Sequence, residues 1–297
     1  MSKGMNGATK TAILSNRSVL RLVGPDRFTF LQGLISQDIQ LAMDGKPLFT
    51  AFLTPQGKCL FDFFIIPQGE HLLIDCEAAQ QNELVRRLIF YKMRSNVALE
   101  DTRNHFSVVA CWSAPSNHPQ AFIDPRYTGL GERIIIRKTD EASIPTNREE
   151  NDYKEHRYKN GVAEGSHEIE VGLATLLEIN FDTLNAISWT KGCYMGQELT
   201  ARTRYRGLIK KRYLPFKFEG LPPERHHDIL HEGFTVGRVM AIGKDYGLGQ
   251  FQIDKIRPFI EQKRIVVHHG TTFDVRVPEY LKAKIFQNEI QSENPLV

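Results

Sequence analysis

Apolar residues in the first half of the chain are spaced as short strands and a few helices. Phe28, Leu31, Leu34 and Ile35 recur at helical spacing after Asp26, a favourable helix N-cap residue. Three later apolar runs are separated by short turns, which predict an antiparallel meander because parallel strands need a longer crossover connection. The predicted strands are 19–23, 48–53, 59–66, 71–76, 97–99, 106–111 and 133–137, and the further predicted helices are 77–93 and 148–160.

The pattern changes near residue 210. From Arg212 onward, short apolar runs alternate with glycine turns, and several short strands at such spacing indicate a small β-barrel. The strands expected there are 213–218, 234–242, 249–253, 264–267 and 272–277. We therefore predict an α+β protein with antiparallel sheets, divided into a first domain at 1–210, a β-barrel domain at 211–284 and a polar tail at 285–297.

Composition excludes several classes of protein. Hydrophobic residues make up 41% of the chain and charged residues 25%, as in globular proteins. The net charge of +3 is too small to indicate RNA binding by bulk charge. No apolar run approaches the ~18 residues of a membrane helix. Residues 1–18 lack the apolar segment of a secretion signal, so we expect a frayed N-terminus, a cytoplasmic protein and no membrane partner.

The four cysteines are Cys59, Cys76, Cys111 and Cys193, and no two of them form a CxxC pair. This spacing excludes a zinc finger or a thioredoxin-like motif, and we expect free thiols rather than disulfides. The first three lie on or beside predicted strands, where a cysteine usually acts as a small buried apolar residue.

The segment 191–212, KGCYMGQELTARTRYRGLIKKR, is the most informative part of the sequence. Cys193 lies two residues from Lys191 and is followed by Arg202 and Arg206. A cationic neighbourhood lowers the pKa of a thiol and favours the thiolate, which makes Cys193 the candidate catalytic residue. The structural alternative is a small buried residue followed by a basic run on a solvated strand face.

The residues around Cys193 suggest a shaped loop. Gly192 and Gly196 permit backbone turns that other residues resist. Tyr194 lies between them, and the side chains of Gln197 and Glu198 are able to orient or hydrogen-bond a ligand.

The string K-G-C-Y-x-G-Q-E, followed by A-R and R-G-x-x-K-R, resembles the signature of the YgfZ family of folate-binding proteins. This family is a branch of the larger group that includes the aminomethyltransferase (T-protein) of the glycine cleavage system. The resemblance extends over most of the chain, at residues 14–39, 52–58, 91–97, 124–133, 161–165 and 235–239.

The resemblance implies a fold and a function. Family members have an N-terminal α+β region around a central folate site and a C-terminal β-barrel. They support the assembly or repair of iron–sulfur clusters, especially for 4Fe–4S enzymes, and the motif cysteine, here Cys193, is the residue on which that activity depends. Bacterial members are cytoplasmic and eukaryotic relatives are mitochondrial. The segment Q-E-L-T-A-R-T is similar to the mitochondrial branch.

The resemblance also implies a folate site. In the transferase relatives a glutamate in a strand-like L-x-L-E segment binds the pterin, and T-L-L-E-I-N places Glu178 there, although Leu176 stands where family members often carry proline. A carboxylate suits the adjacent N–H donors of a pterin. Asn180 and Asp182 flank Glu178 as candidate supports. The alternative reading of Glu178 is a surface strand residue.

The transferases carry a pair of aspartates after their first hairpin, and the first is taken as catalytic. The corresponding residues here are Phe61 and Asp62. An aromatic ring cannot stabilise a developing positive charge as a carboxylate does, so this departure argues against aminomethyl transfer and leaves Asp62 as a candidate folate contact.

Two other features suggest weaker hypotheses. A metal site would need late histidines to converge, and tyrosines interleaved with arginines are able to stack bases, which would suit an RNA-binding or tRNA-modification module. The histidines are His226, His227, His231, His268 and His269, and the tyrosines are Tyr194, Tyr205 and Tyr213.

The leading prediction is a tetrahydrofolate-binding accessory factor for 4Fe–4S cluster assembly or repair, with a folate-dependent aminomethyl or one-carbon transferase as the alternative. Cys193 would ligate a cluster transiently or attack a damaged thiol. One cysteine cannot hold a cluster alone, so an iron–sulfur assembly protein such as an A-type carrier, a second chain or glutathione would complete the coordination. We expect a mitochondrial matrix location if the source is eukaryotic.

Overall fold

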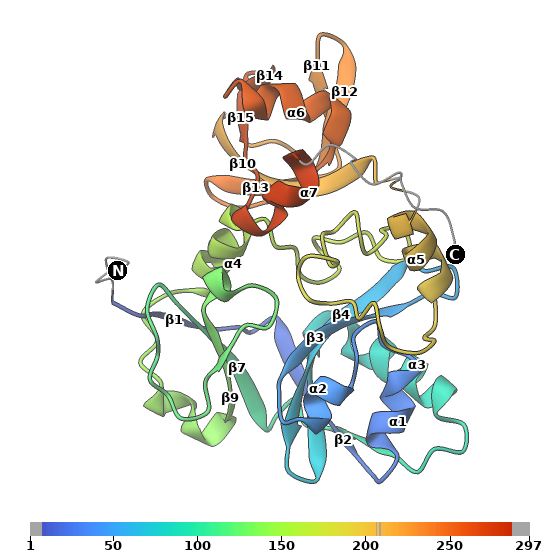
Figure 1. The fold of residues 1–297 in the computed structure, drawn as a ribbon. Helices are drawn as coiled ribbons and strands as arrows, with labels where there is room; N and C mark the ends of the chain where they lie inside the picture. Colours follow the sequence, from blue (N-terminus) through green and yellow to red (C-terminus); the bar gives the residue numbers. More distant parts are fainter. Residues whose placement is uncertain (1–7, 206, 208, 287–297) are drawn as a thin grey trace, which may run out of the picture.

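Antiparallel sheets organise the chain (Figure 1). The computed structural model describes residues 8–205, 207 and 209–286, and within these residues the strands form three sheets. The first sheet has the order β3-β4-β5-β2-β6, the second β1-β7-β9-β8 and the third β11-β12-β13-β10-β15-β14. This arrangement confirms the predicted α+β class with antiparallel pairing.

The first sheet contains the predicted meander. Its strands are β2 (Arg17–Val23), β3 (Leu48–Leu53), β4 (Cys59–Gln68), β5 (His71–Glu77) and β6 (Ala98–Asp101), and its helices are α1 (Arg27–Gln32), α2 (Gln40–Met43) and α3 (Gln81–Lys92). Helix α3 buries Leu84 and Leu88 because residues four apart share one helix face. Asp26 is the N-cap residue of α1, as predicted, but its side chain makes no cap hydrogen bond. Its Oδ2 instead accepts the backbone N–H of Asn96, in the connection between α3 and β6, at 2.7 Å.

The second sheet begins at the N-terminus. Its strands are β1 (Lys10–Ile13), β7 (Phe106–Trp112), β8 (Phe122–Ile123) and β9 (Glu132–Arg137), followed by α4 (Glu150–Lys159). The prediction of a frayed start is wrong for Lys10–Ile13, because this strand pairs with β7 over its whole length.

Short 3-10 turns connect elements in all three parts of the chain: η1 (Ala78–Gln80), η2 (Thr128–Leu130), η3 (Lys138–Ser143) and η4 (Glu279–Leu281).

The third sheet forms the C-terminal part. Its strands are β10 (Lys211–Gly220), β11 (Asp228–His231), β12 (Phe234–Ile242), β13 (Tyr246–Gln252), β14 (Val266–His268) and β15 (Thr271–Val275). The sequence did not reveal β11, nor helix α6 (Ile253–Glu261), whose Ile253, Ile256 and Phe259 pack into the core of this part. Helix α7 (Lys282–Phe286) buries Ile285, so the predicted polar tail does not begin at residue 285; residues 287–297 lie outside the described residues.

The third sheet is joined to the rest of the chain through α4. Figure 1 shows α4 between β1 and the C-terminal part. The carboxylate of Glu155 on α4 accepts the backbone N–H groups of Lys244, Asp245 and Tyr246 at 2.7 to 2.8 Å, and so caps the turn between β12 and β13. The hydroxyl of Tyr280 donates to the carbonyl of Gly161 at the end of α4. No helix in the described part of the chain is long and apolar enough to cross a membrane.

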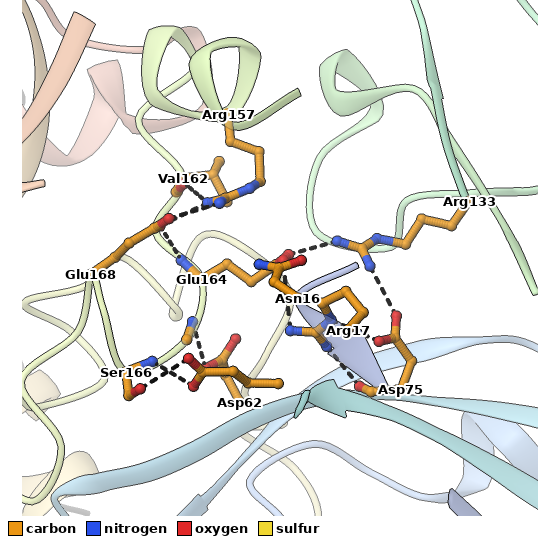
Figure 2. Close-up of polar contacts among 12 residues, drawn as sticks. Asn16, Arg17, Asp62, Asp75, Arg133, Arg157, Val162, Glu164, Ser166 and Glu168 are labelled. Carbon is orange, nitrogen blue, oxygen red and sulfur yellow. Dashed lines mark hydrogen bonds and ion pairs between the residues drawn. The ribbon is translucent and has the colours of Figure 1, made fainter. Parts of the chain in front are cut away.

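A buried ion network occupies the space between the first two sheets and α4 (Figure 2). None of its eight side chains is more than 4% exposed. The network consists of Arg17, Asp75, Asp124, Arg126, Arg133, Arg157, Glu164 and Glu168.

Glu164 is the shared acceptor of this network. Its Oε2 receives N–H groups of Arg126 and Arg133, each at 2.6 Å, and its backbone N–H donates to Glu168. Figure 2 shows Arg133 reaching from β9 to both Glu164 and Asp75. Burial alone would raise the pKa of the Glu164 carboxyl, but the surrounding arginines outweigh it and hold this pKa well below its usual value.

We predict that Glu164→Gln destabilises the protein by about 3–5 kcal/mol, because it leaves Arg126 and Arg133 buried with too little opposing charge. The matched control is Glu100→Gln, which breaks the exposed pair with Arg21 and should cost less than about 1 kcal/mol. Urea unfolding of the two variants measures the difference. Equal losses would contradict the dependence of the fold on the network.

Candidate functional site

Cys193 is exposed, whereas Cys59, Cys76 and Cys111 are buried. Burial raises the pKa of the Cys76 thiol to about 12 and also raises the pKa values of Cys59 and Cys111. A buried thiol with a raised pKa is a poor nucleophile and a poor metal ligand. The predicted core positions of the first three cysteines are therefore confirmed, and Cys193 is the thiol that a reagent or partner can reach.

Lys191 fixes the loop that carries Cys193. Its side chain turns into the protein, and Nζ donates to the backbone carbonyls of Gln32, Ile35 and Gln37 at 2.7 to 2.9 Å. An ammonium has three N–H groups, so these acceptors satisfy it completely. Burial lowers the pKa of Lys191 to about 8. The hydrogen bonds of Lys191 thus attach the loop to the end of α1 and to the residues that follow it.

The same loop also packs against the hairpin between β3 and β4. Gly196 has a φ of +80°, and a Cβ there would lie 2.6 Å from the carbonyl oxygen of Thr54 and 2.9 Å from Cα of Gly57. Gly57 in turn leaves no room for a side chain beside the carbonyl of Gly196. The F-L-T-P-Q-G-K and K-G-C-Y-x-G-Q-E strings therefore meet in space, and their glycines allow the close contact.

The basic run after Cys193 begins as helix α5 (Gln197–Tyr205), so the prediction of a solvated strand face is wrong up to Tyr205. Tyr194 is buried in the core before the helix starts, so its ring is not exposed for the base stacking that the RNA-binding hypothesis requires. Along α5, Arg202 pairs with Glu198 one turn earlier, and Arg204 lies 4.0 Å from the ring of Trp189. Arg206 lies outside the described residues, and Gly192 is exposed beside Cys193.

Glu178 lies in a series of turns, not in a strand as predicted. The half-buried carboxylate accepts the backbone N–H and the hydroxyl of Thr175 through one oxygen, Oε2, at 2.9 Å each. Its backbone carbonyl accepts the N–H of Tyr213 at the start of β10 at 2.8 Å. The turns place Glu178 beside the first strand of the C-terminal part.

Asn180 and Asp182 are bound to the same strand. Asp182 holds Arg212 through two hydrogen bonds of 2.9 Å, and Oδ1 of Asn180 accepts a third from the same guanidinium. The amide of Asn180 donates to the carbonyl of Tyr213 at 2.7 Å, and its backbone takes a φ of +64°. These side chains already have protein partners, so in this arrangement they shape the turns around Glu178.

Asp62 is a buried carboxyl with an incomplete set of partners. Oδ1 accepts the N–H of Gly165 at 3.0 Å, and Oδ2 has no hydrogen-bond partner among the described residues. Burial raises the pKa of Asp62 to about 6 against the opposing effect of Arg17, and the charges of Glu164 and Glu77 raise it further. Phe61, one residue earlier on β4, points into the apolar core of the first sheet instead.

Tyr213 is a second buried group with an open hydrogen-bonding position, and the sequence did not mark it as part of a folate site. The side chain is fully buried, and its hydroxyl has no hydrogen-bond partner in the described part of the chain. Burial raises the pKa of Tyr213, and the charges of Glu170 and Glu178 raise it further. In the sequence, only its position near the basic run drew attention to Tyr213. The burial of its side chain depends on tertiary packing, which the local sequence does not show.

The late histidines do not form a metal site. Within the residues that the structure describes, no group of three or more histidine, cysteine, aspartate or glutamate side chains converges as metal ligands would.

We predict that Asp62 makes stability depend on pH. The folded-state pKa of about 6 lies above the ~3.9 of an unfolded aspartate, so the folded protein binds the proton more tightly and loses stability as the pH rises from about 4 to 6. Asp62→Asn removes this loss. Relative to wild type, its unfolding free energy should therefore increase by about 3 kcal/mol between pH 4 and pH 7. A difference that stays constant over this pH range would contradict the assignment.

Comparisons with known proteins identify the family. Residues 210–283 match the model of the CAF17 C-terminal beta-barrel domain, which agrees with the predicted barrel. The glycine cleavage system aminomethyltransferase T of Bartonella henselae has the same fold, with a TM-score of 0.69 at 14% identity over 96% of this chain and 89% of that chain.

The sequence relatives are named iron–sulfur cluster assembly factor IBA57, mitochondrial, or its homologues. The human protein is 32% identical over 281 residues, which cover 82% of this chain and 78% of the human one. The proteins of Neurospora crassa and Mycosarcoma maydis are 33% and 34% identical over 73% and 74% of this chain, and over 55% and 60% of their own lengths, less than two thirds. These relatives support the wider family that the motif implied, but under the IBA57 name rather than the YgfZ name. The chain belongs to the IBA57 family.

Proposed function

We propose that this protein is an accessory factor for the assembly of iron–sulfur clusters, with Cys193 as the residue that contacts the cluster or its precursor. One observation supports this role most strongly. Cys193 is exposed on a loop that Lys191 and Gly196 hold in place, whereas Cys59, Cys76 and Cys111 are buried. The names of the relatives point to the same activity.

The chemistry requires a partner. The Cys193 thiol releases its proton to solvent, and the thiolate sulfur forms one bond to iron as it displaces another iron ligand. One sulfur supplies one ligand, so the cluster is a shared cargo and the other ligands come from an iron–sulfur assembly protein such as an A-type carrier, or from glutathione. The rigid loop lowers the entropy lost when this bond forms.

We also propose that tetrahydrofolate or a derivative binds between β4 and the turns at 170–180. The groups that fit it are the carboxylate of Glu178, the unpartnered Oδ2 of Asp62 and the unpartnered hydroxyl of Tyr213. Buried polar atoms without partners are costly unless something else satisfies them, and a pterin offers both donors and acceptors. When bound, the folate would supply a one-carbon carrier.

One observation favours a second candidate, a folate-dependent one-carbon transferase. Asp62 is a buried carboxyl with a raised pKa, as general acids and bases often are. Phe61 weighs against this candidate because it stands where the transferases carry their first aspartate. The two functions differ in the substitutions that would abolish them: one-carbon transfer would fail in Asp62→Asn and would persist in Cys193→Ala.

Because Arg202 and Arg204 already contact Glu198 and Trp189, we do not propose RNA binding.

The names of the relatives also bear on location. Because these proteins are called mitochondrial, we propose the mitochondrial matrix for this protein if its source is eukaryotic, and the cytoplasm if it is bacterial.

The cluster role is tested by complementation. In cells that lack their own family member, the intact chain should restore the activity of a 4Fe–4S enzyme, and Cys193→Ala should not. The control is Thr190→Ala, an exposed change on the same loop that should restore activity fully. Rescue by Cys193→Ala would contradict the thiolate mechanism, and failure of all three folded proteins would contradict the assembly role.

The folate site is tested by Tyr213→Phe. Because the hydroxyl has no protein partner, its removal should leave the free energy of unfolding unchanged or higher, while the affinity for tetrahydrofolate falls about two- to tenfold. Isothermal titration measures the affinity, and Tyr205→Phe, which alters an exposed ring, serves as control. Unchanged affinity in Tyr213→Phe would place the folate elsewhere.

A further inference from the structure

A cavity of about 580 Å³ lies where β1 and the loops after β7 and β8 meet α4. An adjoining hollow of about 240 Å³ extends it toward Tyr246 of the C-terminal part. Lys10, His156 and Lys159 line both spaces. The combined cavity is large enough for a small organic molecule. None of the residues considered for the cluster or folate site lines it.

Three basic and three acidic side chains line the combined cavity: Lys10, Arg148 and Lys159, and Glu132, Asp152 and Glu155. Lys10 and Lys159 extend from β1 and the end of α4, and neither forms an ion pair with another described residue. Two lysines that line one cavity and have no ion-pair partner are available to bind a negatively charged group.

The acids nearby are already engaged. Glu132 accepts the backbone N–H and the hydroxyl of Ser116 at 2.7 and 2.6 Å. Glu155 caps the turn between β12 and β13, and Asp152 belongs to the capping box at the start of α4. These carboxylates keep their charge, but their oxygens bind other donors, and none of them forms an ion pair with Lys10 or Lys159.

His156 lines both spaces together with the two lysines, and its Nδ1 has no hydrogen-bond partner among the described residues. Its Nε2 is 2.9 Å from the carbonyl of Gly129, so the ring donates there and leaves Nδ1 open. The ring stacks on Trp112 with centroids 5.9 Å apart. Burial lowers the pKa of His156, and the charges of Lys10 and Lys159 lower it further. An oriented imidazole acceptor and two cations that line one cavity suit a ligand that carries both a hydrogen-bond donor and a negative charge.

The remaining walls are apolar and held in fixed conformations. Ala114, Pro115 and Ile123 supply apolar surface, and Ile123 is 61% exposed. Ser113 takes a φ of +75°, a strained conformation for a residue with a side chain. A Cβ on Gly131 would lie 2.1 Å from the carbonyl oxygen of Cys111, so only glycine fits there. The cavity is thus a shaped feature of the fold.

We propose that this cavity binds an organic anion, with its carboxylate, sulfonate or phosphate group between Lys10 and Lys159 and its apolar body against Ala114 and Ile123. Such a ligand would touch β1, α4 and the loops of the second sheet at once. It would therefore stabilise the junction at which α4 meets the C-terminal part.

A matched pair of dyes tests the charge requirement. The probe is 1-anilinonaphthalene-8-sulfonate, and N-phenyl-1-naphthylamine is the same molecule without its sulfonate. We expect saturable one-to-one binding of the sulfonate and at least tenfold weaker binding of the uncharged dye. In Trp189→Phe, energy transfer from Trp112, which lines the adjoining hollow, should persist and report the position of the dye.

Variants of the cavity complete the test. Lys10→Gln/Lys159→Gln should weaken binding of the sulfonate at least tenfold, and Ala114→Trp, which fills the cavity, should abolish it. The control is Lys46→Gln/Lys284→Gln, which removes two exposed lysines elsewhere and should leave the affinity unchanged. Circular dichroism verifies that each variant is folded. Absence of saturable binding, or equal affinity in the two double variants, would overturn the proposal.

Discussion

The buried ion network between the two N-terminal sheets is the constraint on which the rest of the structure depends. Moving eight charged side chains out of water costs more than their attraction returns unless nearly every hydrogen bond is made. Glu164 meets this condition by receiving both Arg126 and Arg133, while its own backbone N–H bonds to Glu168. The segment that follows α4 is consequently fixed against β4, and Gly165 is placed beside Asp62.

The candidate folate site and the Cys193 loop lie on the segments that continue from this fixed point. The turns after the network bring Glu178 beside Tyr213, whose buried hydroxyl has no hydrogen-bond partner among the described residues. Further along the chain, Lys191 and Gly196 attach the motif loop to α1 and to the first hairpin. This attachment keeps the neighbouring Cys193 at the surface. The motif residues around the cysteine thus act mainly by positioning it, which explains why they are lysine and glycine rather than further thiols.

The sequence predicted the meander and much of the barrel because alternation and glycine turns are local signals. It failed where a tertiary contact decides the outcome. Helix α6 was not predicted, because the residues at its start were assigned to a strand. The basic run after Cys193 begins as helix α5, whose start packs on the first hairpin. Asn180 and Asp182 were predicted as folate contacts, but nothing local to them indicated that Arg212, some thirty residues later, would take their hydrogen bonds. The ion network was not predicted either, because its partners lie on segments far apart in the chain and no local pattern indicates that they pair.

Cys193 is the one exposed thiol among the described residues, and alkylation measures this accessibility directly. Native protein treated with iodoacetamide at neutral pH and digested for mass spectrometry should be modified at Cys193 alone, and all four cysteines should react after unfolding in guanidinium chloride. Protection of Cys193 in the native protein, or modification of Cys59, Cys76 or Cys111 at a similar rate, would contradict the claim that this loop presents the reactive sulfur.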